Sequence, residues 1–210
     1  MAPAAQKRSY HHGNLPAALV DAALELIGEH GVQGFSVAEA ARRTGVSISA
    51  PYRHFADRED LIAACAVAAC EEMRKRFAAA VAEADSPADQ LAAASAAYVR
   101  FAAERRSMFE ALFGAGLDKT KYPQLQAAVT AVIETVLGAA RELAPKGDDE
   151  SAAVLLEAMT GLAQGHATLL LDGRYGDMPQ GVDLACERVA AATRALVRGR
   201  SLLFSPAAAG

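Results

Sequence analysis

Residues 36–47 read SVAEAARRTGVS, and this stretch decides the fold of the N-terminal part of the chain. Ser36 is followed three residues later by Glu39, the spacing of a capping box. In that arrangement the serine side chain accepts a hydrogen bond from the backbone N–H of the glutamate, so a helix begins directly after the serine. The stretch therefore predicts a short helix over residues 37–43.

The end of this helix predicts a tight turn into a second one. Thr44-Gly45 stops the helix, because glycine adopts the positive φ that a sharp turn requires. Val46 supplies an apolar residue that packs into the angle between the helices, and Ser47 caps a further helix over residues 48–55. Two short helices joined in this way form a candidate helix-turn-helix, whose second helix presents polar side chains to base edges. The spacing alone also fits an ordinary helical hairpin.

Helical signals continue on both sides of this motif. Upstream, Asn14 begins a helix over residues 14–30 that Gly31 ends. Downstream, Asp57 caps a long helix over residues 58–84. Further helices are predicted over residues 87–104, 105–114, 122–143, 149–172 and 179–198, and most breaks between them contain glycine or proline. We therefore predict an all-α fold, with three short helices followed by a larger helical bundle.

The composition supports this class of fold. Of the 210 residues 52% are apolar and 22% are charged, with a net charge of −4, which is enough apolar content for a packed core. Alanine, the best helix former, supplies 51 residues, and the Val/Ile-rich runs of a buried parallel sheet are missing. The three cysteines, Cys65, Cys70 and Cys186, have neither the number nor the spacing of a disulfide scaffold or a metal motif. We expect buried free thiols in a reducing compartment.

Nothing in the sequence predicts export or membrane insertion. The first residues lack the apolar core of a signal peptide. The most apolar stretch, residues 158–171, is too short to cross a bilayer and is interrupted by Gln164 and His166, so we expect a buried helix. We predict a cytoplasmic protein without a membrane partner.

The positive charge of the chain is local. Residues 36–58 carry four arginines against Glu39 and Asp57, a net of +2, although the whole chain is acidic. A modest basic patch over a candidate helix-turn-helix favours DNA binding but does not establish it.

The N-terminal residues have two interpretations. Lys7, Arg8 and Tyr10 belong either to an arm that follows DNA or to a solvated tail. His11 and His12 are adjacent, but a third ligand is missing nearby in the sequence, so no metal site is predicted there.

Residues 10–62 resemble the DNA-binding domain of the TetR family of bacterial repressors. The resemblance rests on Gly45-Val46-Ser47, then Tyr52-x-His54-Phe55, then Asp57-Arg58-Glu59-x-Leu61. It implies an all-α homodimer whose N-terminal helix-turn-helix binds a palindromic operator in double-stranded DNA. It also implies a C-terminal bundle that binds a small-molecule effector and thereby releases the DNA. Residues 161–166, GLAQGH, resemble more weakly a C-terminal ligand-binding domain in which a Trp-His-Gly triplet is usual, whereas this chain has no tryptophan.

The resemblance further implies a set of DNA contacts: Ser36, Ser47, Ser49, Ala50, Tyr52, Arg53, His54 and Arg58. Ser36 and Tyr52 resemble phosphate contacts, whereas Ser47, Ser49, Ala50 and Arg53 fall where the recognition helix meets bases. An arginine there can donate two hydrogen bonds to the O6 and N7 atoms of guanine. His54 and Arg58 resemble phosphate or helix-positioning contacts. The structural alternatives are a core-rim role for Tyr52 and a solvated charge for Arg53, and Pro51 stands where an apolar residue other than proline is usual.

Aromatic residues gather on the predicted helices after residue 87. The candidate ligand contacts are Tyr98, Phe101, Phe109, Phe113 and His166, although residues at helical spacing also build cores. Gly161 and Gly165 let another helix approach closely, and with Leu169 they form the candidate dimer interface. Packing within the chain is the alternative for these three residues.

These observations lead to one expected function and two alternatives. Residues 1–60 are predicted to form the DNA-binding domain, and residues 61–210 the effector-binding and dimerisation domain. The expected protein is a DNA-binding transcriptional regulator, a homodimeric repressor released from a palindromic operator by an effector. A helical ligand-binding or protein-interaction module without DNA binding is one alternative. A small helical enzyme is the other, which the lack of a catalytic set or a phosphate loop disfavours. No cofactor is predicted.

Overall fold

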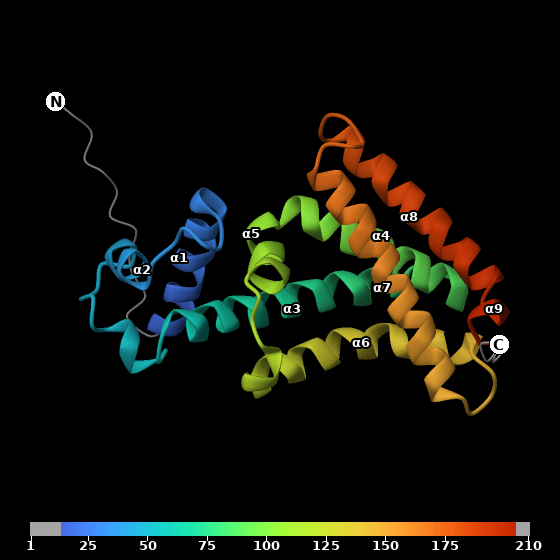
Figure 1. Cartoon of the computed structure of the whole chain (residues 1–210), viewed down its shortest axis with the longest axis horizontal. Helices are drawn as coiled ribbons and strands as arrows, with labels where there is room; N and C mark the ends of the chain where they lie inside the picture. Colours follow the sequence, from blue (N-terminus) through green and yellow to red (C-terminus); the bar gives the residue numbers. More distant parts are fainter. Residues whose placement is uncertain (1–13, 205–210) are drawn as a thin grey trace, which may run out of the picture.

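The computed structural model of the protein describes residues 14–204, and every regular element in that range is helical (Figure 1). The N-terminal part holds α1 (Leu15–His30), α2 (Val37–Arg43) and the 3₁₀ turn η1 (Pro51–Arg53). The long helix α3 (Arg58–Ala82) follows, and then α4 (Pro87–Glu104), α5 (Arg106–Phe109), the π-helical turn η2 (Glu110–Gly114) and the 3₁₀ turn η3 (Lys119–Lys121). The chain continues with α6 (Pro123–Leu143), α7 (Asp149–Leu171), α8 (Gln180–Arg198) and the short α9 (Ser201–Phe204).

Side-chain caps start the helices where the sequence predicts them. The Ser36 Oγ accepts a hydrogen bond from the Glu39 N–H at 3.2 Å, and Asn14 and Asp57 cap α1 and α3 in the same way. Each cap satisfies a backbone donor that has no partner within its helix. The predicted bounds of the long helices are confirmed to within two residues.

The N-terminal unit is built around one small apolar core. Leu19, Leu26 and Ile27 of α1 meet Phe35 and residues of the first turns of α3. Leu61, Ile62 and Cys65 supply the α3 side of this core. The proposed division at residue 60 therefore falls within a helix that belongs to both parts of the molecule.

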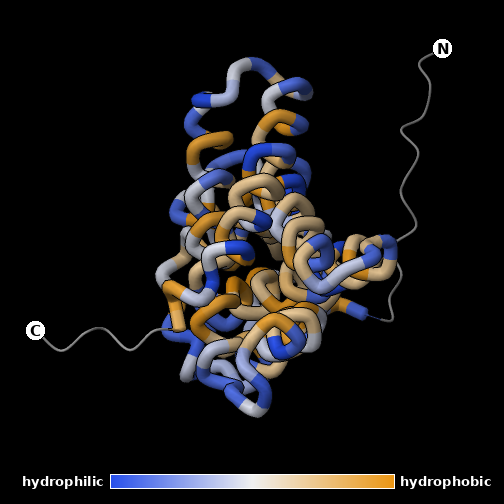
Figure 2. The backbone as a smooth tube through the Cα atoms, turned by 90° about the vertical axis from the view of Figure 1, so that its right-hand side faces the viewer, coloured by the Kyte–Doolittle hydropathy of each residue, from blue (hydrophilic) through white to orange (hydrophobic). Residues whose placement is uncertain are grey.

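The rest of α3 leads into the C-terminal bundle, where α4 packs against α3, α6, α7 and α8 (Figure 1). Its residues Leu91, Val99 and Phe101 are fully buried in a second, larger core. Figure 2 shows hydrophilic segments gathered at the turns and hydrophobic segments within the packed helices. This arrangement holds the N-terminal unit at one end of the bundle.

Two predicted helices differ from the structure. The predicted helix over residues 48–55 is wrong: the segment consists of turns with the single 3₁₀ turn η1. Pro51 explains the difference, because its nitrogen cannot donate the hydrogen bond that a regular helix would send back to the Ser47 carbonyl. The Ala50 N–H donates to that carbonyl instead, at 2.9 Å. The helix predicted over 105–114 splits into α5 and the wider turn of η2.

Helix α7 is the apolar helix that the sequence singles out. By length and composition alone it could cross a membrane, and it is the one such helix among residues 14–204. In the structure it packs against α4, α6 and α8, with Leu155, Met159, Ala163 and Leu170 buried. Its packing is that of a bundle helix.

Candidate DNA-binding surface and effector cavity

The turn after α2 has the geometry of a helix-turn-helix. Gly45 has a φ of 73°, and a Cβ built there would meet no described atom within 4 Å, so the backbone angle alone selects glycine. The Val46 N–H donates to the Ala41 carbonyl at 3.0 Å, and the Thr44 hydroxyl donates to the end of α2. These bonds fix the direction in which the chain leaves α2.

The segment after the turn presents its side chains outward. Tyr52 is 53% exposed, and Ser47, Ser49, Arg53 and His54 are also exposed, whereas Ala50 is half-buried. Pro51 and Phe55 anchor the segment from beneath, because both are buried. The structure therefore brings the predicted base-contacting side chains together on one surface, and their contacts with DNA remain a prediction.

Sequence reasoning missed Ile48 on this surface. Its side chain is 55% exposed between Ser47 and Ser49, whose hydroxyls lie 3.2 Å apart. An apolar side chain in this position can contact the methyl group of thymine. At helical spacing Ile48 would share a face with Pro51 and Phe55, three and seven residues later, so the sequence pattern favours a buried position for it. The turns around η1 expose it instead.

Arg58 holds the N-terminal unit together. Its guanidinium donates to the Phe35 carbonyl at 3.2 Å and to the Val32 carbonyl, and it lies over the Phe35 ring at 5.0 Å. These are helix-positioning contacts, one of the two roles expected for it. Ser36, which caps α2, is exposed beside this region.

Arg43 ties α2 to α1. Its guanidinium donates two hydrogen bonds of 2.8 Å to the carboxylate of Glu29. This bidentate pairing lowers the pKa of Glu29, chiefly through the hydrogen bond. The candidate arm residues Lys7, Arg8 and Tyr10, and the pair His11 and His12, lie outside the described residues.

The C-terminal bundle encloses an apolar cavity of about 730 Å³ between α3, α4, α6 and α7. This volume lies in the range of small-molecule binding sites. Apolar side chains such as Met73, Phe77, Val132 and Leu156 form most of its wall. Such a wall removes apolar ligand surface from water, which is favourable in proportion to the area buried.

The predicted ligand contacts divide between this wall and the core behind it. Tyr98 and Phe113 line the cavity, and the Tyr98 hydroxyl donates to the Gln164 side chain, which also lines it. Phe109 is buried against both aromatic rings, with centroids 5.9 and 4.9 Å away. Phe101 is buried in the core and His166 lies elsewhere on α7, so neither is part of the wall.

His166 belongs to a separate cluster beside the cavity. Its Nδ1 lies 2.5 Å from the Tyr175 hydroxyl, and the Arg188 guanidinium lies 5.6 Å from the Tyr175 ring centre. Burial lowers the pKa of His166, and the charge of Arg188 lowers it further. The cluster connects α7 to α8 and to the turn between them.

The candidate dimer residues form an exposed stripe on α7. Gly161, Gly165 and Leu169 are spaced four residues apart, so they lie on one face of the helix. All three are exposed, Leu169 by 42%. Because the stripe is exposed in the single chain, a helix of a second copy could pack against it.

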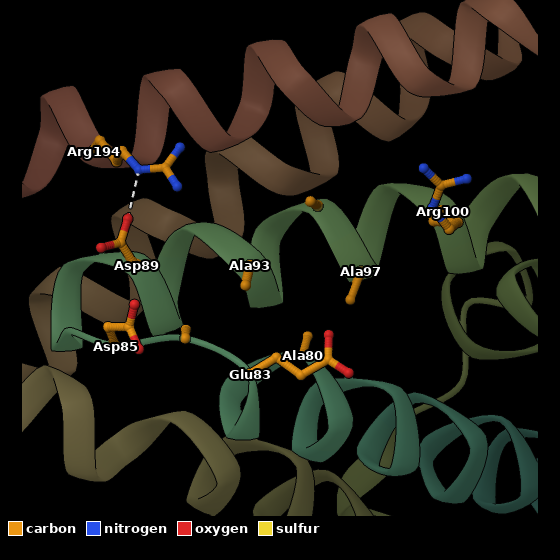
Figure 3. Close-up of a pocket in the computed structure, with 10 residues that line it drawn as sticks. Ala80, Glu83, Asp85, Asp89, Ala93, Ala97, Arg100 and Arg194 are labelled. Carbon is orange, nitrogen blue, oxygen red and sulfur yellow. Dashed lines mark hydrogen bonds and ion pairs between the residues drawn. The ribbon is translucent and has the colours of Figure 1, made fainter.

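A second, more polar groove of about 540 Å³ lies between α3, α4 and α8. Its floor contains Ala80, Ala93 and Ala97, and Arg194 reaches across it to Asp89 at 2.8 Å (Figure 3). Arg100 at its edge is already paired with Asp183, also at 2.8 Å. Because both arginines of its lining have carboxylate partners, this groove offers no unpaired arginine to a ligand. Within residues 14–204 no group of three potential metal ligands comes together.

Two family models match the chain. The model described as "Bacterial regulatory proteins, tetR family" matches residues 19–65, and the model described as "Tetracyclin repressor-like, C-terminal domain" matches residues 91–193. The HTH-type transcriptional regulator BetI of Agrobacterium fabrum (strain C58 / ATCC 33970) is 33% identical over 76 residues. These are 36% of this chain and 37% of that protein, so the match spans little more than a third of its length.

Solved structures match over nearly the whole chain. A protein of unknown function from Rhodococcus sp. RHA1 is 29% identical, with a TM-score of 0.72 and coverage of 92% of this chain and 98% of that one. A TetR family transcription regulator from Marinobacter aquaeolei VT8 shares the fold, with a TM-score of 0.62 at 17% identity over 84% of this chain and 94% of that one.

The chain belongs to the TetR family of bacterial regulatory proteins. The predicted family and the predicted all-α fold are thereby confirmed. The family models and the match to BetI support a role in DNA-binding transcriptional regulation, and the family points to a non-enzymatic role. Regulators of this family bind DNA and act as dimers with small-molecule effectors.

Proposed function

We propose that the protein is a cytoplasmic, homodimeric repressor that binds a palindromic operator and leaves it when an effector enters the cavity of the C-terminal bundle. The recognition segment with Ile48, Ser49, Tyr52 and Arg53 reads the DNA in this proposal. The α7 stripe supplies the dimer contact. One observation carries the proposal: the turn η2 takes part in both the cavity wall and the N-terminal core.

The residues of η2 connect the two sites within a few ångströms. Phe113 lines the cavity, whereas Ala111, two residues earlier, is fully buried in the N-terminal core. A Cβ on Gly114 would lie 3.7 Å from Val32, whose carbonyl accepts a hydrogen bond from Arg58. A shift of Phe113 therefore acts directly on the packing that holds the helix-turn-helix. Wider π-helical turns of this kind often occur at functional sites.

The mechanism follows from the geometry of a dimer on DNA. Two recognition segments must lie about 34–36 Å apart to enter successive major grooves on one side of the duplex. A ligand that binds more tightly to a state of the bundle in which the two recognition segments lie at a different separation stabilises that state. The affinity for DNA then falls in proportion to the ratio of the ligand's affinities for the two states.

The proposal is tested on operator DNA with a variant that fills the cavity. Val129 of α6 lines the cavity, and Ala127 lies two residues earlier on the exposed face of the same helix. We expect small molecules extracted from the source organism to release the unaltered protein and the Ala127→Phe control from the operator. The Val129→Phe variant should stay bound, because its new ring occupies the ligand volume.

An electrophoretic mobility-shift titration measures this difference, with melting temperatures to show that both variants fold. Equal release of both variants would contradict a role for the cavity. A protein that never binds a defined DNA sequence would contradict the proposed function as a whole.

A further inference from the structure

One end of the C-terminal cavity carries a cation without a carboxylate partner. Lys119 of η3 lines the cavity, and its Nζ lies 5.4 Å from the ring centre of Phe113. No carboxylate of residues 14–204 lies within 4 Å of it as a salt bridge. The adjacent Asp118 accepts hydrogen bonds from the backbone N–H and the hydroxyl of Thr120 instead. The charge of Lys119 is therefore available to a ligand.

Further polar side chains lie at this same end. The Phe113 ring is 5.8 Å from the Tyr98 ring, and the Tyr98 hydroxyl donates to the Gln164 side-chain oxygen. This bond leaves the Gln164 amide nitrogen, a donor, without a hydrogen-bond acceptor among the residues that the structure describes. Lys119 and Gln164 thus supply donors around Phe113, and neither donor group has to give up a hydrogen bond or an ion pair among the described residues to bind an acceptor.

The opposite end of the cavity is apolar. Along α3 the wall runs from Cys70 to Phe77, which is about 10 Å at the rise of an α-helix. Cys70 marks the lysine end, because Tyr122, directly after η3, contacts Glu59 in the first turn of α3, and Cys70 is nearer to that turn than Phe77. Val136 and Leu137 continue the apolar wall on α6, and Glu157 is exposed at the edge on α7. A ligand that fills this space needs an elongated apolar body.

We propose that the cavity binds an amphipathic organic anion, with its carboxylate at Lys119 and its apolar body along Met73, Phe77 and Val136. An apolar body gains from leaving water, and a carboxylate neutralises the lysine in a site where water screens the charge only partly. This inference deepens the proposed function, since it names the chemical class of the effector.

The test compares three probes with the same ten-carbon chain by isothermal titration calorimetry. Decanoate, decanol and decylamine are titrated into the full-length protein at concentrations at which each is monomeric. We expect decanoate to bind at least tenfold more tightly than decanol, and decylamine to bind most weakly. Equal binding of the three probes, or tightest binding of decylamine, overturns the proposal.

Matched lysine variants locate the charge that matters. Lys119→Met should weaken decanoate binding about tenfold and leave decanol binding within twofold, whereas Lys121→Met, an exposed lysine outside the wall, should change neither. Lys119→Arg keeps the charge and should retain decanoate binding, which excludes misfolding as the cause. Equal weakening of decanoate and decanol by Lys119→Met overturns the assignment of the carboxylate to Lys119.

DNA binding separates this inference from the proposed function. If none of the probes binds a protein that still binds its operator, the ligand class is wrong and the regulator stands. If the probes bind as expected and no operator exists, the proposed function fails and the ligand class stands.

Discussion

Two arginines five positions apart have different surroundings at the N-terminal end of the molecule. Arg53 is exposed, and Arg58 is half-buried with hydrogen bonds to two backbone carbonyls. In the sequence both residues are positive charges near a turn. Their surroundings differ in the structure because the Arg58 guanidinium packs over the Phe35 ring. At the residue scale we therefore propose that Arg53 reads bases and that Arg58 supports the N-terminal unit.

The first prediction concerns Arg53. Arg53→Ala should reduce affinity for the selected operator by about 1–3 kcal/mol and relax base preference at one or two positions. Arg74→Ala, which removes an exposed charge from α3, is the control and should leave base preference unchanged. Competition binding against operators with single substitutions measures both. An equal loss on every sequence would show that Arg53 contacts phosphate.

The second prediction concerns His166 and pH. Burial lowers its pKa in the folded protein, so the unfolded chain binds more protons as the pH falls below the ordinary histidine value of about 6.5. The free energy of unfolding should therefore decrease between pH 7.5 and pH 5. His166→Gln should make this decrease smaller, as urea unfolding followed by circular dichroism would show. The same decrease in both proteins would contradict the assignment.

At the scale of the element, the turn between α2 and η1 depends on one backbone angle. Gly45 and Gly138 both have open space where a Cβ would go, but only Gly45 has a positive φ. Substituting each glycine therefore distinguishes the effect of backbone conformation from the effect of side-chain packing.

The third prediction uses this pair. Gly45→Ala should lower the free energy of unfolding by about 1–2 kcal/mol, because an L-residue is strained at positive φ. Gly138→Ala, within α6, should raise it by about 0.5–1 kcal/mol. Urea unfolding measures both changes. A stabilised Gly45→Ala variant would be incompatible with the turn described here.

The starts of α1, α2 and α3 can be predicted from the sequence, because each depends on a hydrogen bond between residues that are close together in the chain. Asn14, Ser36 and Asp57 cap helices as their sequence positions indicate. The missing donor of Pro51 costs little in the first turn of a helix, so the sequence favours a helix there, yet the segment forms only η1. The widened turn η2 had no sequence signal, because its form depends on contacts with α1 and α3 that are distant in the chain.

Of the two candidate sites, the sequence predicts the DNA-binding surface better than the cavity. The exposed face at Tyr52 and Arg53 follows from the turn and the motif, whereas the cavity depends on how α3, α4, α6 and α7 meet. Among the predicted aromatic residues, Tyr98 and Phe113 reach the cavity and Phe101 packs in the core. Lys119 was missed because it lies in a short turn outside every periodic segment.

At the scale of the whole molecule, the proposed function needs two copies of this chain. The proposed interface is the α7 stripe of Gly161, Gly165 and Leu169, and glycines at this spacing allow close helix packing. Because Gly161 also lines the cavity, a partner on this stripe would lie beside the bound effector.

The fourth prediction tests this interface. Leu169→Glu should shift the protein from dimer towards monomer at micromolar concentration, because a charge would be buried without a partner. Ala78→Glu, on an exposed face of α3, introduces the same charge elsewhere and should leave the dimer intact. Sedimentation velocity distinguishes the two states. A dimer of unchanged stability in Leu169→Glu would place the interface on another surface.

The most direct test of the account is selection of bound fragments from sheared genomic DNA of the source organism, followed by titration of the enriched fragment at several salt concentrations. We predict a palindromic sequence whose affinity falls steeply with salt, since each neutralised phosphate adds a slope of about −0.9 in log K against log salt. Combined alanine substitution of Tyr52 and Arg53 should abolish the enrichment. No enrichment by the ligand-free protein even at low salt would contradict the central claim that this surface reads DNA.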